Sequence, residues 1–271
     1  MDKISDFNWD EVWQKQMRPI ADQGEDAAYW DKRAQKKSVT HDNYAQELLK
    51  RIEVSSSDSV LDAGCGNGWV TVPLAKLARR VTALDISPVS LTVLQKAAEQ
   101  AGITNITPLT GDFPALYRNG GLKSHDIVIA SRSLPMGNLK TSLAAMNALA
   151  VKRCYLTWTS GESELIKNVC ALSGQKYSPF PEYPLILNLL YSMGIHAGLQ
   201  LFFVEGSRNY TSIDDALNET MHRYAITDKE VLKKIKDYIA TQLIEENGKY
   251  RLDTKSEWAL IRWQNKQVDC K

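Results

Sequence analysis

The chain has 271 residues, of which 44% are hydrophobic and 24% are charged. These ordinary values exclude a disordered, collagen-like or disulfide-scaffold chain and indicate one large domain, or little more, with a sizeable core. Its 33 lysines and arginines balance 32 aspartates and glutamates, so the formal net charge of +1 excludes a strong overall basic field for nucleic acid.

The sequence predicts no metal site, disulfide framework or membrane anchor. The cysteines are scattered, without a CxxC pair or a Cys/His cluster at zinc spacing. The first ten residues lack the apolar segment of a secretory signal, and the longest apolar stretch, around 185–190, is too short to span a bilayer. We therefore expect a soluble, cytoplasmic protein with reduced thiols, no bound metal and no membrane partner.

Residues 1–55 are polar and charged but contain several aromatic side chains. A segment this poor in aliphatic residues cannot form its own core, whereas its aromatics need a surface to pack on. We expect a helical lid over residues 1–55, with helical apolar spacing over 42–52 leading into a main domain over 56–271.

Residues 58–160 form the core of that domain, where short apolar runs alternate with helical patterns. Ser87 is a good N-cap and Pro88 suits the first position of one such helix. Pro108 indicates an edge or an end for the third strand. The alternation predicts an α/β fold with a doubly wound, mostly parallel sheet and helices on both faces. The predicted strands are 59–63, 81–86, 106–109, 126–131 and 153–158.

The last third of the chain is less regular. The two strands expected there are separated by more residues than a hairpin needs. We predict a helical insertion over about 205–256, which either caps a ligand pocket or buries a face against a second subunit, as in a homodimer. The predicted elements are a buried helix at 185–192, strands at 199–204 and 257–263, and amphipathic helices at 212–224 and 228–245.

The sharpest motif lies at the end of the first core strand, where three glycines follow at alternate positions. Gly64, Gly66 and Gly68 let the chain turn tightly and bring its backbone into contact with a ligand. Doubly wound sheets bind ligands at this end of their strands. The spacing matches neither a phosphate loop nor the GxGxxG of nicotinamide dehydrogenases. A glycine turn without a ligand is the plainer alternative.

Two acids follow at the ends of the next strands. Asp85 comes about 20 residues after the loop, where a carboxylate can accept hydrogen bonds from both ribose hydroxyls of a nucleoside. It could instead cap the next helix, a role for which Ser87 is already available. Asp112 can accept a hydrogen bond from an exocyclic amine, and Phe113 can line an adenine.

Taken in order, the motifs LDAGCGNG, ALDIS, GDF and DIVIAS resemble those of the class I S-adenosylmethionine-dependent methyltransferases. The resemblance covers about residues 58–160. It implies a seven-stranded Rossmann-like sheet whose last strand is antiparallel. It also implies an enzyme that uses S-adenosylmethionine as its cofactor and releases S-adenosylhomocysteine.

The resemblance also assigns roles to matching positions. Asp62 would order the loop or contact the methionine ammonium, Asp85 would bind the ribose, Ile86 would pack on the adenine, and Ser131 would lie near the methionine. Cys65 is a small filler in the loop rather than a nucleophile. The full set of cofactor-binding residues implied for the core is Asp62, Gly64, Cys65, Gly66, Gly68, Asp85, Ile86, Asp112, Phe113 and Ser131.

The N-terminal segment around 29–34 resembles one that closes over the cofactor in many small-molecule methyltransferases. Trp30, Arg33 and Tyr44 are therefore candidates for contacting cofactor or acceptor. Packing on the sheet edge is the alternative for other aromatics of the segment, such as Trp13.

Methyl transfer from a sulfonium is an in-line displacement, for which positioning contributes most, and a base is needed only for a protonated acceptor. His41 and His196 are weak candidates for such a base, whereas His125 is expected to be exposed. Arg132, after the fourth strand, either pairs with a carboxylate or phosphate of an acceptor or forms a structural ion pair.

The segment after the fourth strand lacks the Asn/Asp-Pro-Pro-Tyr/Phe motif and the Pro-Cys nucleophile of DNA-methylating members of the family. We therefore expect no DNA partner and predict methyl transfer to a small-molecule acceptor. Two alternatives remain open, namely a non-catalytic protein that binds S-adenosylmethionine or S-adenosylhomocysteine, and a methyltransferase that acts on protein or RNA.

Overall fold

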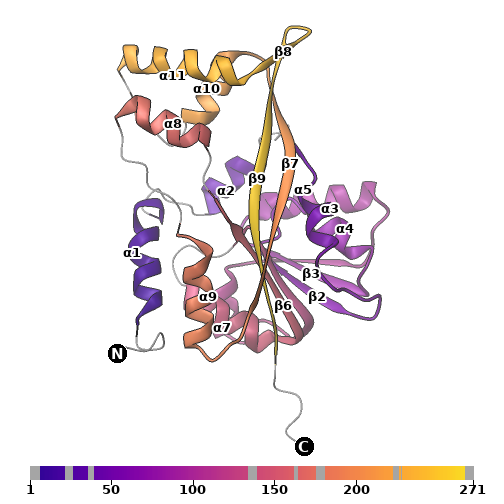
Figure 1. The fold of residues 1–271 in the computed structure, drawn as a ribbon. Helices are drawn as coiled ribbons and strands as arrows, with labels where there is room; N and C mark the ends of the chain where they lie inside the picture. The colour runs from indigo at the N-terminus through magenta and orange to yellow at the C-terminus, as the bar shows by residue number, and fades with distance from the viewer. Residues whose placement is uncertain are drawn as a thin grey trace, which may run out of the picture.

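The computed structural model describes residues 7–21, 27–35, 40–133, 139–161, 164–174, 181–221, 226 and 228–265. Within these residues, nine strands form one sheet in the order β1-β7-β9-β6-β5-β2-β3-β4, and β8 pairs with β9 (Figure 1). The strands are β1 (Thr40–Asp42), β2 (Ser59–Ala63), β3 (Arg80–Asp85), β4 (Ile106–Thr110), β5 (His125–Ser131), β6 (Ala150–Thr159), β7 (Gly198–Tyr210), β8 (Ile244–Glu246) and β9 (Lys249–Gln264).

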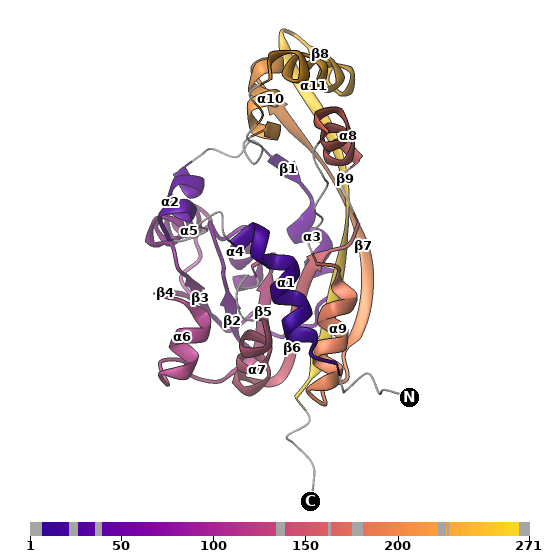
Figure 2. The ribbon, with the colours of Figure 1, turned by 90° about the vertical axis from the view of Figure 1, so that its left-hand side faces the viewer.

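Helices cover both faces of this sheet (Figure 2). The helices in the described part of the chain are α1 (Trp9–Ala21), α2 (Ala27–Gln35), α3 (Tyr44–Leu49), α4 (Thr71–Ala75), α5 (Pro88–Gln100), α6 (Phe113–Arg118), α7 (Leu139–Leu149), α8 (Glu164–Ser173), α9 (Tyr183–Ser192), α10 (Ile213–Met221) and α11 (Lys229–Gln242).

The predicted sheet architecture is confirmed. Strands β2 to β6 pair in parallel, and β9 runs antiparallel to both β6 and β7. The structure adds β1 and β8, two strands of three residues each, to the seven that the resemblance implied. Strands this short carry too little alternation to be recognised from a sequence.

Local signals in the sequence explain two features that orient the site. The Ser87 hydroxyl accepts a hydrogen bond from the backbone N–H of Ser90, and Pro88 begins α5, so the predicted cap is confirmed. Pro108 lies in β4, which ends the sheet and pairs only with β3 in the described structure. The missing N–H of proline is tolerated at such an edge.

Two apolar clusters fill the space between the sheet and its helices. On one face, α1, α7 and α9 cover side chains of β5, β6 and β9, and on the other, α3 and α4 cover side chains of β2, β5 and β7. Trp13 of α1 is fully buried, with its ring 5.0 Å from that of Trp158. Met17 is also buried, so α1 is part of the core.

The remainder of the N-terminal segment reaches other parts of the sheet. Strand β1 pairs with β7, from Thr40 opposite Arg208 to Asp42 opposite Gly206. The segment was expected to be helical, but it therefore also contains a short strand. Helix α2 packs on α5 and is held there by the Ser87 hydroxyl, which donates a hydrogen bond of 2.5 Å to Asp31.

The predicted limits of the helical insertion, 205–256, are wrong. Strands β7 and β9 remain paired out to Tyr210 and Tyr250, so the insertion spans residues 211–248. The outer half of this ribbon extends beyond the sheet and carries α8, α10 and α11 around a third apolar cluster (Figure 1). The sequence underpredicts these strands because most of their side chains are exposed or only partly buried, so apolar and polar residues do not alternate regularly.

Candidate functional site

The glycine loop turns directly beneath the end of β3. The backbone N–H groups of Gly64 and Cys65 both donate to the Leu84 carbonyl, at 2.7 and 3.0 Å. The Asp85 carboxylate accepts from the N–H of Gly66 at 2.7 Å and from the N–H of Ser87 at 2.9 Å. This one side chain therefore holds the loop against the start of α5.

The three glycines all have positive φ but face different surroundings. A Cβ at Gly64 would overlap the Cβ of Ser133, and one at Gly68 would lie 2.7 Å from Leu94. A Cβ at Gly66 would meet nothing within 4 Å. Gly64 and Gly68 thus serve close packing, whereas Gly66 faces open space.

Asp62 lies beneath the loop and is buried. Its carboxylate accepts a hydrogen bond of 2.7 Å from the Thr71 hydroxyl and so joins β2 to the first residue of α4. Burial raises the pKa of Asp62 to about 6, with the Asp85 charge adding to the effect. The hydrogen bond links the two chain segments that flank the glycine loop, which is compatible with the predicted role of ordering that loop.

The residues expected at an adenine lie at the ends of β3 and β4. Ile86 has 38% of its surface exposed although it is apolar. Asp112 caps α6 by accepting from the N–H of Ala115 at 2.8 Å, and Phe113 is buried in the core beside Leu116. Asp112 therefore already has a structural role, whereas Ile86 offers an apolar surface.

A second group of side chains lies at the ends of β5 and β6. The hydroxyl of Tyr44, which is buried, is hydrogen-bonded with Ser131 at 2.8 Å and Thr157 at 2.5 Å. The Arg132 guanidinium lies 3.9 Å from the centre of the Tyr44 ring and 5.6 Å from that of Trp258. Sequence reasoning missed Thr157 and Trp258, because the pairing of β6 with β5 brings Thr157 here and the pairing of β9 with β6 brings Trp258.

The structure places the other candidates differently. His196 is exposed, contacts Tyr191 edge-on, and precedes β7 near the opposite end of the sheet. Trp30 packs edge-on against Tyr29 in α2. His41 and Arg33 belong to β1 and α2, but their side chains lie outside the described structure.

Two further residues have environments that oppose acid–base or nucleophilic chemistry. Burial raises the pKa of the Cys65 thiol, as do the charges of Asp62 and Asp85, so the thiol stays protonated. His125 was expected to be exposed, but it is buried. Its ring is hydrogen-bonded with the Thr82 hydroxyl and the Lys123 carbonyl. Burial lowers the pKa of His125.

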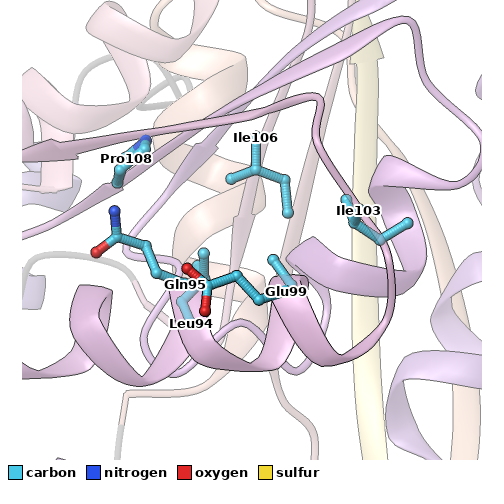
Figure 3. Close-up of a pocket in the computed structure, with 7 residues that line it drawn as sticks. Leu94, Gln95, Glu99, Ile103, Ile106 and Pro108 are labelled. Carbon is cyan, nitrogen blue, oxygen red and sulfur yellow. The ribbon is translucent and has the colours of Figure 1, made fainter.

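An open groove of about 150 Å³ lies elsewhere, between α5 and β4 (Figure 3). None of the predicted site residues lines it. The groove is lined by Leu94, Gln95, Ala98, Glu99, Ile103, Ile106 and Pro108.

In the described part of the chain no three acidic, histidine or cysteine side chains gather into a metal-binding group, and no helix is both long and apolar enough to cross a membrane.

Comparisons with known proteins identify a methyltransferase domain in this chain. Residues 60–151 match the family model of a methyltransferase domain. An uncharacterized protein of Haemophilus influenzae is 28% identical over 268 residues, which cover 96% of this chain and 97% of that protein. A ubiquinone biosynthesis O-methyltransferase of Methylocella silvestris is 36% identical over 80 residues, 27% of this chain and 29% of that enzyme.

A solved structure supports the fold independently. The crystal structure of a putative methyltransferase from Bacillus halodurans matches with a TM-score of 0.55 at 16% sequence identity, covering 82% of this chain and 98% of that one. Residues 60–151 thus match a methyltransferase domain, and the strand order and the glycine loop followed by Asp85 agree with the resemblance to class I S-adenosylmethionine-dependent methyltransferases.

Proposed function

We propose that this chain binds S-adenosylmethionine at the glycine loop and transfers its methyl group to a small-molecule acceptor. One observation carries the proposal. Asp85 fixes the backbone of Gly66 in a left-handed conformation whose Cβ position faces open space. A loop held this way can bring its backbone against a ligand. The plainer alternative, a glycine turn without a ligand, does not explain why the Cβ position of Gly66 is open.

The residues present fit the nucleoside part of this cofactor. Each oxygen of the Asp85 carboxylate uses one lone pair on a backbone N–H, so both can still accept from ribose hydroxyls. Ile86, the next residue, offers an exposed apolar surface suited to an adenine ring. Asp62 lies below the loop with a raised pKa, so a cofactor ammonium nearby would stabilise its charged form.

S-adenosylmethionine, when bound, supplies a methyl group that is already activated on a sulfonium. The chain's own residues then have to position the acceptor and exclude water. The side chains available for this on the far side of the loop are Tyr44, Ser131, Arg132 and Trp258.

Helix α2 is the element best placed to act as the expected lid. It is attached through Asp31 to Ser87, the residue whose N–H also donates to Asp85. Helix α1, in contrast, is fixed by the burial of Trp13. We infer that a closing movement involves α2 and leaves α1 in place.

Two observations favour a small acceptor. The sequence lacks the base-methylating motifs, and its net charge of +1 provides little attraction for nucleic acid. The ribbon of β7 and β9 also raises α8, α10 and α11 beyond the carboxyl ends of the parallel strands, the side on which the glycine loop lies (Figure 2). Helices in that position are suited to enclosing a small molecule.

The proposal is tested in two steps. Calorimetric titration of the full chain with S-adenosylhomocysteine should show one saturable site. Release of S-adenosylhomocysteine from S-adenosylmethionine should then depend on an added metabolite drawn from a panel. Absence of binding would contradict the proposal altogether. Binding without release for any small molecule, but with release for a protein or RNA fraction, would contradict the small acceptor.

A further inference from the structure

We propose that Arg132 binds an anionic group of the methyl acceptor, a carboxylate or a phosphate. The inference rests on the proposed function and deepens it, because it names the chemical class of the acceptor. The observations that carry it are the backbone conformation of Arg132, the two rings that hold its guanidinium, and its position beside the glycine loop.

The backbone of Arg132 is strained. Among the described residues, two other than glycine have positive φ, namely Arg132 at 57° and Asn247 at 53°. Asn247 precedes Gly248 in the turn between β8 and β9, where asparagine adopts this conformation readily. Arginine has no such preference, and strain of this kind persists where the surrounding structure enforces it, often at functional sites.

Several contacts enforce the conformation of Arg132. Its N–H donates to the Thr157 hydroxyl at 3.1 Å, and its guanidinium lies over the rings of Tyr44 and Trp258. Tyr44 is itself fixed, since it is buried and its hydroxyl is hydrogen-bonded with Ser131 and Thr157. The guanidinium is therefore held in place before any ligand arrives.

Stacking suits an arginine to the binding of an anion. The guanidinium of Arg132 lies over the Tyr44 ring, and a guanidinium held by such a contact presents a planar fork of N–H groups that matches a carboxylate or phosphate. Arg132 is exposed, so a ligand can approach it from solvent. Lysine could not reproduce the arrangement, because an ammonium is a point charge without a flat face.

The position of Arg132 assigns the anion to the methyl-transfer site. Ser133, the next residue, donates a hydrogen bond of 2.5 Å to the Ala63 carbonyl and packs against Gly64. Arg132 is thus directly beside the glycine loop. The rings that hold it come from α3 and from Trp258 at the point where β9 leaves β6, both outside the matched domain at 60–151. Residues outside that domain are those best suited to select an acceptor.

The cofactor also carries a carboxylate, so the experiment must separate two sources of the same chemistry. Full-length protein saturated with S-adenosylhomocysteine is titrated with sodium benzoate and with inorganic phosphate, against sodium chloride of equal ionic strength. Binding is followed by nuclear magnetic resonance through the backbone amides of residues 131–133. We expect saturable shifts with benzoate or phosphate and none with chloride.

Three variants test whether Arg132 is responsible for these shifts. Arg132→Gln should weaken anion binding at least tenfold. Arg132→Gly should do the same while relieving the positive φ, so loss of binding cannot be attributed to a failure to fold. Arg118→Gln, at the exposed end of α6, should bind as the wild type does. No saturable shift in the wild type, or equal affinity in the Arg132 variants, would overturn the inference.

A second experiment compares the binding affinity for S-adenosylhomocysteine with that for 5′-methylthioadenosine, which lacks the methionine carboxylate. If Arg132→Gln weakens binding of the first about tenfold and leaves the second unchanged, Arg132 binds the cofactor and the inference is wrong. Unchanged affinity for both supports it. A wild-type chain that does not bind S-adenosylhomocysteine contradicts the proposed function. One that binds it without an anion response contradicts only this inference.

Discussion

The carboxylate of Asp85 accepts a hydrogen bond of 2.7 Å from the backbone N–H of Gly66, which lies 19 positions earlier in the chain. A second oxygen of the same carboxylate accepts from the N–H of Ser87. The shape of the glycine loop and the start of α5 therefore depend on one side chain. The same side chain is proposed to bind the ribose, so its loss should affect both folding stability and ligand binding.

Replacing Asp85 with alanine is expected to weaken binding of S-adenosylhomocysteine by roughly 10- to 100-fold, because hydrogen bonds to charged groups contribute about 1.5–3 kcal/mol. It should also lower the free energy of unfolding, since two backbone N–H groups lose their acceptor. Calorimetry and urea unfolding measure the two effects separately.

The matched control for Asp85 is Asp228, which caps α11 by accepting from the N–H groups of Glu230 and Val231. Asp228→Ala should reduce stability by about 0.5–2 kcal/mol, the usual effect of losing a cap, and leave ligand affinity unchanged. Equal affinities for the two alanine variants would show that Asp85 has a structural role alone.

Alanine at Gly64 should mainly reduce stability, whereas alanine at Gly66 should mainly reduce cofactor binding. Both positions have positive φ, so both substitutions carry a strain of about 1 kcal/mol. The added methyl at Gly64 also overlaps Ser133, whereas that at Gly66 meets nothing within 4 Å. We expect Gly64→Ala to lower the melting temperature strongly, and Gly66→Ala to fold but lose cofactor binding. Full binding by a folded Gly66→Ala variant would place the cofactor elsewhere.

Asp62 should make stability depend on pH in a direction opposite to that of most carboxylates. Its folded-state pKa, about 6, lies above the ordinary value of 3.8, so the folded protein binds the proton more tightly than the unfolded chain. The stabilisation is complete below about pH 4 and is lost as the pH rises through 6, with a total on the order of 1–3 kcal/mol.

The substitution Asp62→Asn would remove this dependence, because an amide is neutral throughout and its oxygen can still accept from Thr71. Urea unfolding of the wild type and of the variant should therefore show a stability difference that grows in favour of the variant between pH 4 and pH 7. A constant difference over that range would mean that Asp62 titrates normally.

Trp13 tests whether α1 belongs to the core. The side chain is fully buried against Trp158, so Trp13→Ala should lower the free energy of unfolding by about 3–5 kcal/mol. Tyr29→Ala, in α2, should cost much less because Tyr29 is only half-buried. Similar losses for both variants would contradict the division between a fixed α1 and a movable α2.

Much of the sheet can be predicted because its signals are local. Ser87 followed by proline marks the start of α5, and Pro108 marks the edge strand. The glycine loop and Asp85 are recognisable from spacing alone. The extensions of β7 and β9 over 205–210 and 249–256 are not, since they depend on pairing with each other across a long separation in the chain.

The second half of the site is harder to predict for a related reason. Thr157 becomes a neighbour of Tyr44 only once β6 is placed beside β5 and α3 is packed on the sheet. The left-handed conformation of Arg132 likewise has no sequence signal, because arginine does not favour it. Such contacts depend on tertiary packing, which patterns along one chain do not encode.

The most direct test of the proposed cofactor site is hydrogen exchange of the full chain with and without S-adenosylhomocysteine. We predict protection of the amides of Gly64–Gly68 and of Asp85–Ser87, where the loop and the Asp85 carboxylate meet. We expect smaller protection over α2 and none over α10 or α11 beyond the ribbon. Ligand binding by calorimetry with unchanged exchange at Gly64–Gly68 would contradict the proposal that this loop binds the cofactor.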